Sequence, residues 1–448
     1  MSIKKRNRFA SIVVAVNLIL MMIPLTVAPA LAADPGTYNP GDIVVINSII
    51  ANNGLGWTTA EPDDGSYVPE DWEGVFWSPD DTDMRIIGLF IDYCDLTGSL
   101  NVSGLADLQW LECSGNQLSA LDVSGLDNLY NLFCSENNLA TLNVSGLLEL
   151  GQLDCRYNQL TTLNASGLPN LEVIDCNDND LATLNVSGLP RLWGLFCGNN
   201  KLTTLNASGL DNLETLICSG NLLTTLNISG LASMRTLDCS DNQLTTLDLS
   251  GLVNLADFDC SGNRLTALDM SGLDNLMQLY CSYNQLTALD VSGLDDLALL
   301  YCSGNRLTAL TASGLDNLAH LYCSGNQLAA LDVSGLDNLV FLYCDNNRLT
   351  ALDVSGLDKL MDIYCEGNQL TTLDVSGLAN LEYLDCSFNQ LASLNVSGLA
   401  NLVYLCCDEN QLTELDVSGL NNLTQMFCYG NQLKRLDVSG LVNLELLH

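Results

Sequence analysis

Cysteine is the residue type with the most obvious chemical potential in this chain. Eighteen of the 448 residues are cysteines, and sixteen of them follow one another at a constant interval of 21 residues, from Cys113 to Cys428. Cysteines can pair as disulfides, bind metal ions or act as nucleophiles. An even number of cysteines is typical of a disulfide framework in an exported chain. The constant spacing, however, favours a different interpretation.

A repeat of this kind places equivalent cysteines on neighbouring strands, with Cα atoms about 5 Å apart. Each cysteine then has two equivalent neighbours, and all side chains point the same way, which suits disulfide geometry poorly. A linear row also lacks the tetrahedral clustering of a zinc site. We therefore predict a structural ladder of free, buried thiols that act as small apolar core residues. Its representative members are Cys113, Cys134, Cys281 and Cys302, accompanied by Asn116 and Asn284.

Cys406 is the exception, because it directly precedes the ladder residue Cys407. It occupies an outward position, where we expect an exposed thiol. An incidental substitution is one interpretation, and a reactive cysteine is the alternative.

One unit of the repeat follows the pattern L-x-x-L-x-C-x-x-N-x-L-x-x-L-D-V-S-G-L-x-N. The last Leu before the Cys lies two residues from it, so both point to one face of a short strand. The Asn comes where the chain leaves the strand, and its amide can satisfy backbone groups of the turn and of the neighbouring coil. The second half predicts another short extended segment, and the Gly after Ser suits a turn with positive φ. The 21-residue period and this pattern are the leucine-rich repeat signature.

The unit resembles the cysteine-ladder leucine-rich repeats of internalin J and related Gram-positive surface proteins. The residues that match are Leu342-Tyr-Cys344, Asn347, Leu349-Thr350 and Leu352-Asp-Val354-Ser355. The resemblance implies a curved, right-handed solenoid of the α/β type, mostly β, with a parallel sheet on its concave face. It also implies a role in adhesion or recognition at the cell surface. The later modules and the wall anchor of that family are absent from the sequence.

We divide the chain into three parts. Residues 1–32 have the features of a secretory signal peptide: Lys4, Lys5, Arg6 and Arg8 precede an apolar stretch, and Ala30-Leu31-Ala32 predicts cleavage after Ala32. An uncleaved membrane anchor is the alternative. The mature chain has no second apolar run of spanning length, so we expect a secreted or cell-surface protein.

Residues 33–88 predict a small helical N-terminal cap. Gly41-Asp42 followed by Ile43 to Ile50 indicates a capped helix. Trp72-Glu-Gly-Val75 resembles the W-x-G-V cap of plant-type leucine-rich repeats, without its paired cysteines.

Residues 89–448 predict about 17 coils. In the irregular first coil, Ile91 takes the Cys position and Cys94 the Asn position. The chain stops inside the strand that begins at Leu444, so a C-terminal cap is missing. We expect a truncated gene model or fragment, the alternative being a natural end with an exposed sheet edge.

The charge and the polar composition exclude several functions. Asp and Glu number 53 against 15 Lys and Arg, for a net charge of −38, and such a surface repels nucleic acid. There are only two histidines, and no Ser-His-Asp set, phosphate-binding loop or dinucleotide motif occurs. We therefore expect no enzyme, no cofactor and no resident metal.

A ligand is expected on the outward positions of the concave strands. The position before the ladder cysteine carries tyrosine in five consecutive coils, namely Tyr280, Tyr301, Tyr322, Tyr343 and Tyr364. Two residues before that position, further aromatic residues occur at Phe341, Tyr383 and Tyr404. Tyrosine suits protein or glycan recognition, because it combines apolar area with a hydroxyl. The same stacking could be purely structural. Asp154, Asp175, Asp238 and Asp259 occupy this face nearer the N-terminus, where a basic partner would fit.

Two other rows leave alternatives open. Aspartates recur on the turn, at Asp122, Asp248, Asp269, Asp290, Asp332, Asp353, Asp374, Asp416 and Asp437. We favour hydrogen bonds to the turn backbone, and calcium binding is the alternative. Threonines such as Thr161-Thr162 and Thr245-Thr246 would suit an ice- or mineral-binding surface. A spacer solenoid without a ligand is the remaining alternative.

Overall fold

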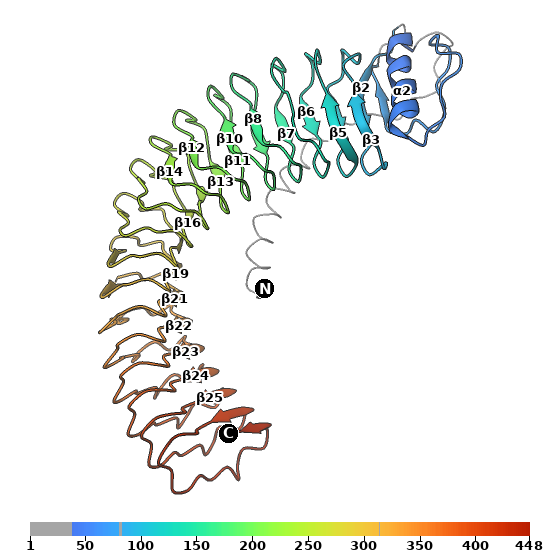
Figure 1. The fold of residues 1–448 in the computed structure, drawn as a ribbon. Helices are drawn as coiled ribbons and strands as arrows, with labels where there is room; N and C mark the ends of the chain where they lie inside the picture. The colour runs from blue at the N-terminus through green and yellow to red at the C-terminus, as the bar shows by residue number, and fades with distance from the viewer. Residues whose placement is uncertain (1–37, 80–82, 313) are drawn as a thin grey trace.

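The computed structural model is an arc-shaped solenoid of about 17 turns, with a small cap at its N-terminal end (Figure 1). It describes residues 38–79, 83–312 and 314–448. The predicted signal peptide lies outside the described residues. Among the residues described, no helix is long and apolar enough to cross a membrane. The predicted class, a mostly β leucine-rich repeat solenoid with a helical cap, is confirmed.

The concave side of the arc is one 19-stranded sheet, in which strands follow one another in chain order. Every pair after the first is parallel. Paired residues are 22 positions apart between β2 and β4 and 21 positions apart in all later pairs, which is the period of the repeat. The strands are β1 (Val75–Trp77), β2 (Ile86–Phe90), β4 (Trp110–Glu112), β6 (Asn131–Phe133), β7 (Gln152–Asp154), β9 (Val173–Asp175), β11 (Gly194–Phe196), β13 (Thr215–Ile217), β15 (Thr236–Asp238), β16 (Asp257–Asp259), β17 (Gln278–Tyr280), β19 (Leu299–Tyr301), β21 (His320–Tyr322), β22 (Phe341–Tyr343), β23 (Asp362–Tyr364), β24 (Tyr383–Asp385), β25 (Tyr404–Cys406), β26 (Gln425–Phe427) and β27 (Leu446–Leu447).

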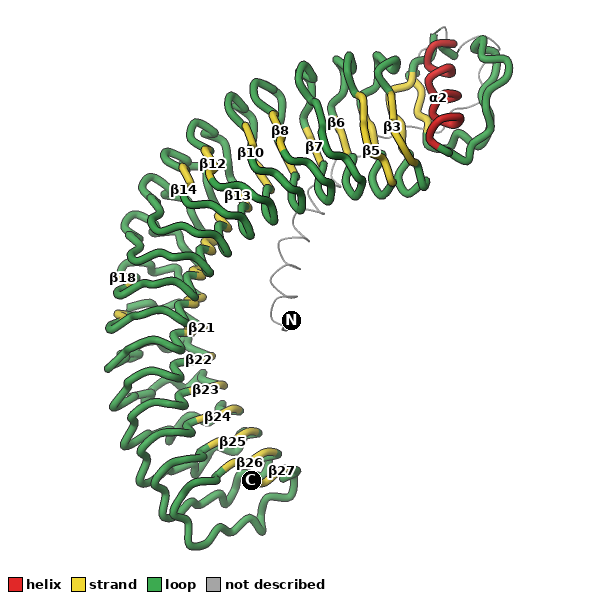
Figure 2. The backbone as a smooth tube through the Cα atoms, in the orientation of Figure 1, coloured by secondary structure: helices red, strands yellow, loops and turns green. Residues whose placement is uncertain are grey.

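The convex side consists mainly of turns and short extended segments (Figure 2). The strands there form separate parallel pairs: β3 (Thr97–Asn101) with β5 (Gln117–Asp122), β8 (Thr162–Asn164) with β10 (Thr183–Asn185), β12 (Thr204–Asn206) with β14 (Thr225–Asn227), and β18 (Leu289–Asp290) with β20 (Leu310–Thr311). The predicted extended segments opposite the main sheet are thus confirmed. The Gly of the Ser-Gly-Leu turn adopts positive φ, as at Gly293 with φ 82°.

The core runs between the two sides as a single continuous cluster. In a regular coil the strand contributes an apolar residue at its centre, and the ladder cysteine follows the strand directly, such as Leu279 and Cys281, both fully buried. Identical coils therefore stack their apolar residues directly on one another, and each coil is stabilised by its two neighbours.

The repeat asparagine makes the hydrogen bonds that its position predicts. The Asn284 amide donates to the carbonyl oxygens of Cys281 in its own coil and Cys260 in the preceding coil, at 3.2 and 2.9 Å. Its Oδ1 accepts the N–H of Leu265 at 2.9 Å. Asn116 makes the equivalent contacts and also accepts from the N–H of Cys94. The asparagines thus join successive coils through the core.

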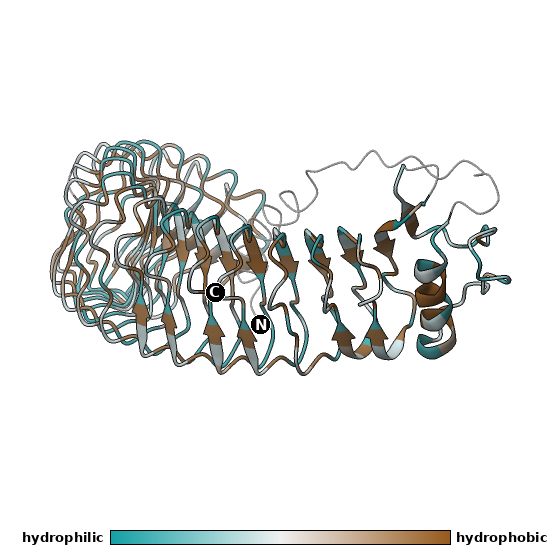
Figure 3. Ribbon diagram, turned by 90° about the horizontal axis from the view of Figure 1, so that it is seen from above, coloured by the Kyte–Doolittle hydropathy of each residue, from teal (hydrophilic) through white to brown (hydrophobic). Residues whose placement is uncertain are grey.

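The N-terminal cap is built on helix α2 (Pro40–Asn53), which lies across the end of the stack (Figure 3). The predicted helix is confirmed, but Asn39 is its N-cap: its side chain accepts the N–H of Asp42 at 3.2 Å. Asp42 lies inside the first turn, where it is buried and pairs with Arg85 at 3.0 Å. Strand β1 pairs antiparallel with β2 and covers the first edge of the sheet.

Strand β2 crosses the predicted boundary at residues 88 and 89, so the cap and the first coil share one strand. Ile91 is fully buried at the Cys position, as expected. Cys94 stands at the Asn position, and its thiol donates to the carbonyl of Asp92 at 3.2 Å. At the other end, the predicted strand after Leu444 is β27, which pairs with β26.

Candidate ligand-binding surface

Five tyrosines form a continuous stack on the concave sheet. Tyr280, Tyr301, Tyr322, Tyr343 and Tyr364 end strands β17, β19, β21, β22 and β23, and are paired in register. We call these five residues the tyrosine ladder. Neighbouring ring centroids lie 4.9, 4.2, 4.3 and 4.5 Å apart, with interplanar angles of 33°, 8°, 14° and 12°. Each ring is partly exposed, so the ladder is an accessible surface feature.

The stacking decides which parts of the rings are available. Both faces of Tyr301, Tyr322 and Tyr343 are covered by neighbouring rings, so these residues present their edges and hydroxyls. The Tyr280 hydroxyl donates to Gln278 Oε1 at 3.0 Å, and the Tyr343 hydroxyl donates to Asp362 Oδ2 at 3.2 Å. Burial raises the pKa of Tyr322, with further contributions from Tyr301 and Tyr343. The ladder therefore offers hydroxyl groups and ring edges at the regular spacing of the strands.

A second aromatic column lies beside the tyrosine ladder. His320 contacts Phe341 with ring centroids 4.7 Å apart, and Tyr383 lies 6.2 Å from Tyr404. Within the described part of the chain, His320 Nδ1 has no hydrogen-bond partner, and burial lowers the pKa of this imidazole. The sequence-predicted aromatic residues thus form two adjacent columns on one face.

Asp154 and Asp175 occupy the expected outward positions but are buried, with 5% and 1% of their surfaces exposed. Arg156 lies 3.4 Å from each carboxylate. Burial raises the pKa of both aspartates, although Arg156 opposes the shift. These two carboxylates belong to an internal ion cluster and are not exposed to a ligand.

Asp238 and Asp259 are partly exposed and more accessible. Each Oδ1 accepts a backbone N–H from the serine two residues later, at 3.0 and 2.9 Å. Asp257, on the same strand as Asp259, adds a third carboxylate that sequence reasoning did not single out.

Two other groups on the concave side were missed by sequence reasoning. Val173, Phe196 and Ile217 form a small buried cluster of their own, against which Trp193 packs. Nearer the cap, Glu112 hydrogen-bonds Asp92, and burial followed by this contact raises the pKa of Glu112 to about 7. The sequence indicates the first cluster only by the apolar residues Val173, Phe196 and Ile217 at outward positions of neighbouring strands.

All 18 cysteines are free thiols. The ladder cysteines from Cys113 to Cys407 are fully buried, and burial raises their pKa values well above the ordinary range. The expectation of an exposed thiol at Cys406 is wrong: its side chain is only 7% exposed. Its thiol donates to Asp408 Oδ2 at 3.7 Å, and burial raises its pKa to about 12.

The turn aspartates hydrogen-bond the backbone, as predicted. Asp353 Oδ1, for example, accepts the N–H of Ser355 at 3.0 Å, and this contact lowers the pKa of the carboxyl. Asp290 and Asp332 show the same arrangement. In the residues that the structure describes, no group of three or more His, Cys, Asp or Glu side chains is placed to hold a metal ion.

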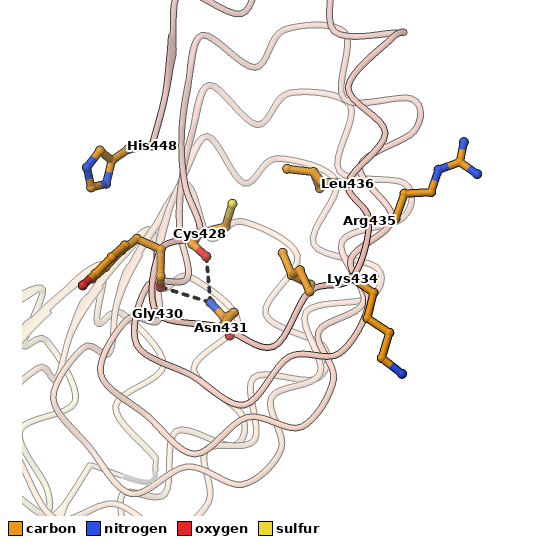
Figure 4. Close-up of a pocket in the computed structure, with 9 residues that line it drawn as sticks. Cys428, Gly430, Asn431, Lys434, Arg435, Leu436 and His448 are labelled. Carbon is orange, nitrogen blue, oxygen red and sulfur yellow. Dashed lines mark hydrogen bonds between the residues drawn. The ribbon is translucent and has the colours of Figure 1, made fainter.

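A pocket lies at the C-terminal end of the stack, beside the last described coil (Figure 4). Asn431 donates to the carbonyls of Cys428 and Tyr429 at its base, and Lys434, Arg435 and His448 lie around it. The lining groups are the same Asn and Leu positions that meet a following coil elsewhere in the stack. The pocket is therefore a feature of coil stacking, and we do not assign it to a ligand.

Comparisons with known proteins agree with this architecture. The profile of the Leucine Rich Repeat family matches residues 380–402. No curated protein matches the chain significantly. Among solved structures, the functional domain of InlJ from Listeria monocytogenes, which includes a cysteine ladder, is 35% identical, with a TM-score of 0.61. The match covers 64% of this chain and 66% of that domain, so about a third of the InlJ domain has no counterpart here.

Two further structures are similar over more of their length. The leucine-rich repeat protein LIC12759 from Leptospira interrogans is 27% identical, with a TM-score of 0.63 and coverage of 77% of this chain and 91% of that one. YopM from Yersinia enterocolitica is 26% identical, with a TM-score of 0.56 and coverage of 78% and 90%.

Proposed function

Because the chain is an internalin-like leucine-rich repeat protein with a cysteine ladder, we propose that it is an exported or cell-surface binding protein. Its concave face engages a protein or a glycan, in an adhesive or recognition role. Curved solenoids offer extended concave surfaces of this kind to their ligands.

The tyrosine ladder is the observation that carries this proposal. Five aromatic side chains occur in register in consecutive coils, at an outward position that elsewhere holds residues as different as Glu112, Ile217 and Asp385. Tyrosine contributes large contact area and a hydroxyl at little cost in conformational entropy. Recognition accounts for its accumulation on a solvent-facing sheet.

The experiment is capture of the exported chain on protein and glycan arrays, in the wild type and in the variant Tyr301→Ala/Tyr322→Ala/Tyr343→Ala. A matched control is Thr161→Ala/Thr203→Ala/Thr224→Ala, because these exposed threonines lie on the opposite side of the stack. We expect the tyrosine variant alone to lose capture of its ligand. Unchanged capture by the tyrosine variant would favour a spacer solenoid whose stacked rings serve only stability.

Export is a separate part of the proposal. Cleavage after Ala32 predicts that the exported protein begins at Ala33, and N-terminal sequencing of secreted material checks this. A protein that retains Met1 in the membrane fraction would instead support the uncleaved anchor.

An ice- or mineral-binding surface receives less support from the geometry. Thr162 and Thr183 are exposed and paired in register on β8 and β10. However, the convex strands occur in separate pairs on the outside of a curve, whereas a crystal face calls for a continuous flat array (Figure 2). A measurement of thermal hysteresis tests this alternative directly.

A further inference from the structure

The tyrosine ladder ends among carboxylates. Its last ring, Tyr364, is adjacent in the sheet to Asp385, and Asp362 and Tyr383 occupy the neighbouring column. Burial raises the pKa of Tyr364, and the negative charges of Asp362, Asp385 and Glu366 raise it further. We call Tyr364, Tyr383, Asp362, Glu366 and Asp385 the acidic end of the ladder. Asp385 is buried and accepts the N–H of Ser387 at 3.0 Å, so the partly exposed carboxylates of Asp362 and Glu366 are the ones that a partner can reach.

The carboxylates of the acidic end have no basic counterpart on their own face. From Asp257 to Phe427, neither Lys nor Arg occurs at any strand position or at the position after a ladder cysteine. The nearest basic side chains are directed elsewhere: Arg348 is exposed on the turn beyond the ladder asparagine, and Lys359 Nζ donates to Asn338 Oδ1 at 2.5 Å in the loop before the strand.

Crowding of negative charge is already visible within the acidic end. Burial raises the pKa of Glu366, and the hydrogen bond with Asp385 and the charges of Asp385 and Asp345 raise it further. A cation placed between these groups would relieve this repulsion.

Ring geometry narrows the class of partner. A sugar ring packs against the flat face of an aromatic side chain, but the faces of Tyr301, Tyr322 and Tyr343 are covered by one another. On its far side, Tyr364 is paired in the sheet with Asp385 rather than with another tyrosine, so the tyrosine ladder ends at this ring, beside a carboxylate. A cationic group bound here would interact with both the ring and the carboxylates. The edges and hydroxyls of the other rings suit the polar backbone of an extended polypeptide.

We therefore propose that the concave face from Tyr301 to Tyr383 is a docking surface for a basic polypeptide segment, with a Lys or Arg side chain held at the acidic end. This inference rests on the proposed concave-face binding function and specifies its partner. Charge complementarity with a chain of net charge −38 selects the occupant. An acidic polypeptide is the occupant that the peptide test would otherwise reveal, and a glycan is the one that the array experiment described above would reveal.

The test measures binding of two fluorescein-labelled peptides to the full chain by fluorescence anisotropy: one alternates Lys and Ser, and the other alternates Glu and Ser. The key variant is Asp362→Asn/Glu366→Gln. Its control is Asp353→Asn/Asp374→Asn, which removes the same charge from neighbouring coils but on the turn, where Asn occurs in other coils. We expect the Lys peptide alone to bind, about tenfold more weakly to the key variant and within about twofold of wild type to the control.

A second variant addresses the ring. Tyr364→Leu keeps the apolar bulk but removes the aromatic face, and we expect about threefold weaker binding of the Lys peptide. Equal weakening by the key variant and its control would overturn the proposal, since it would indicate attraction by net charge alone. Binding of the Lys peptide that is unaffected by the key variant, or preference for the Glu peptide, would overturn it as well.

The outcomes also separate this inference from the proposed function. If the triple tyrosine variant loses its array ligand while Asp362→Asn/Glu366→Gln retains it, concave-face binding stands and the basic partner is refuted. If neither variant loses the ligand, both proposals fail.

Discussion

The side-chain amide of Asn284 donates to the main-chain carbonyl of Cys260, 24 residues earlier, at 2.9 Å. This contact joins two coils through the interior of the stack, where both groups are buried.

Removing the Asn284 amide should destabilise the protein strongly. Asn284→Ala leaves the N–H of Leu265 and the carbonyls of Cys260 and Cys281 without these partners in a buried site. The two carbonyls still accept from the amides of Asn263 and Asn305, so the Leu265 N–H is the group left unsatisfied. An unsatisfied buried group costs about 1 to 3 kcal/mol, and we expect a loss of about 2 kcal/mol in the free energy of unfolding. Urea denaturation followed by circular dichroism measures it.

Asn275→Ala is the matched control, because Asn275 donates to Val253 O at the surface, at 2.8 Å. We expect it to cost less than about 1 kcal/mol, since water can replace an exposed partner. Equal losses in the two variants would contradict a special role for the buried asparagines.

The stability effect of the tyrosines should depend on their place in the ladder. Tyr322 stacks on two rings, at 4.2 and 4.3 Å, whereas Tyr364 stacks on one tyrosine, at 4.5 Å. An aromatic pair contributes about 0.5 to 1.5 kcal/mol beyond its buried area. Tyr322→Leu should therefore lower the free energy of unfolding by about twice as much as Tyr364→Leu. Chemical denaturation of the two variants checks the ratio, and a ratio near one would argue against pairwise stacking.

The buried carboxyl group of Asp175 should make stability fall as pH rises. Its pKa is raised in the folded state by burial and by Asp154, so the folded protein holds the proton more firmly than the unfolded chain. The stabilisation is complete below the unfolded pKa of about 4 and is lost as pH rises through the folded pKa. Asp175→Asn resembles the protonated form, so it should be more stable than the wild type at about pH 8, by about 1 to 3 kcal/mol, and similar to it at about pH 4.

For Asp353 we expect the opposite dependence of stability on pH, and Asp353→Asn tests it. The pKa of Asp353 is lowered by its hydrogen bonds to Ser355, so its carboxylate stabilises the fold above the unfolded pKa and the contribution disappears in acid. This variant should not gain stability at about pH 8. Urea midpoints at both pH values decide between the two behaviours.

Thiol reactivity should separate the cysteines by burial. In the native protein a disulfide reagent such as Ellman's reagent should first modify Cys94 and Cys428, the two half-buried thiols. Cys406 should stay unmodified, because it is buried and its pKa is raised to about 12. Peptide mapping locates the label, and unfolding in urea should release all 18 thiols. Early labelling of Cys406 would show that its cover opens readily.

The repeat period predicted the solenoid, the parallel sheet, the buried cysteines and the asparagine contacts, because each depends on residue type at one position of a constant unit. The ladder of Tyr280 to Tyr364 was predictable for the same reason. The burial of some residues at the outward positions could not be predicted in this way. Asp154 and Asp175 are buried beside Arg156, and Cys406 is buried although its position points outward from the sheet. The burial of such a residue depends on the side chains of neighbouring strands, which the pattern of one unit does not contain.

The sequence also did not reveal one part of the backbone geometry, the positive φ angle before each ladder asparagine. The residue before each ladder asparagine has positive φ, with values near 50° at Glu136, Tyr157 and Phe388. Glycine marks this position in only some coils, as at Gly304. Non-glycine residues adopt this conformation where stacking with the next coil outweighs its cost of about 1 kcal/mol. Likewise, Asn39 rather than Asp42 begins α2, because Arg85 and the N–H of Ile86 hold the Asp42 carboxylate.

The row of free thiols requires that the exported chain folds before its cysteines are oxidised. A chain exported as we propose would meet oxidants while its cysteines are still accessible, and sixteen equivalent thiols can mispair in a great many ways. Each thiol becomes inert once the next coil closes over it, and coils close by contacts only about one repeat apart in sequence, a type of contact that forms rapidly. The yield of native protein thus depends on whether the coils fold faster than the thiols are oxidised. Slower folding should lower the yield, and slower oxidation should raise it.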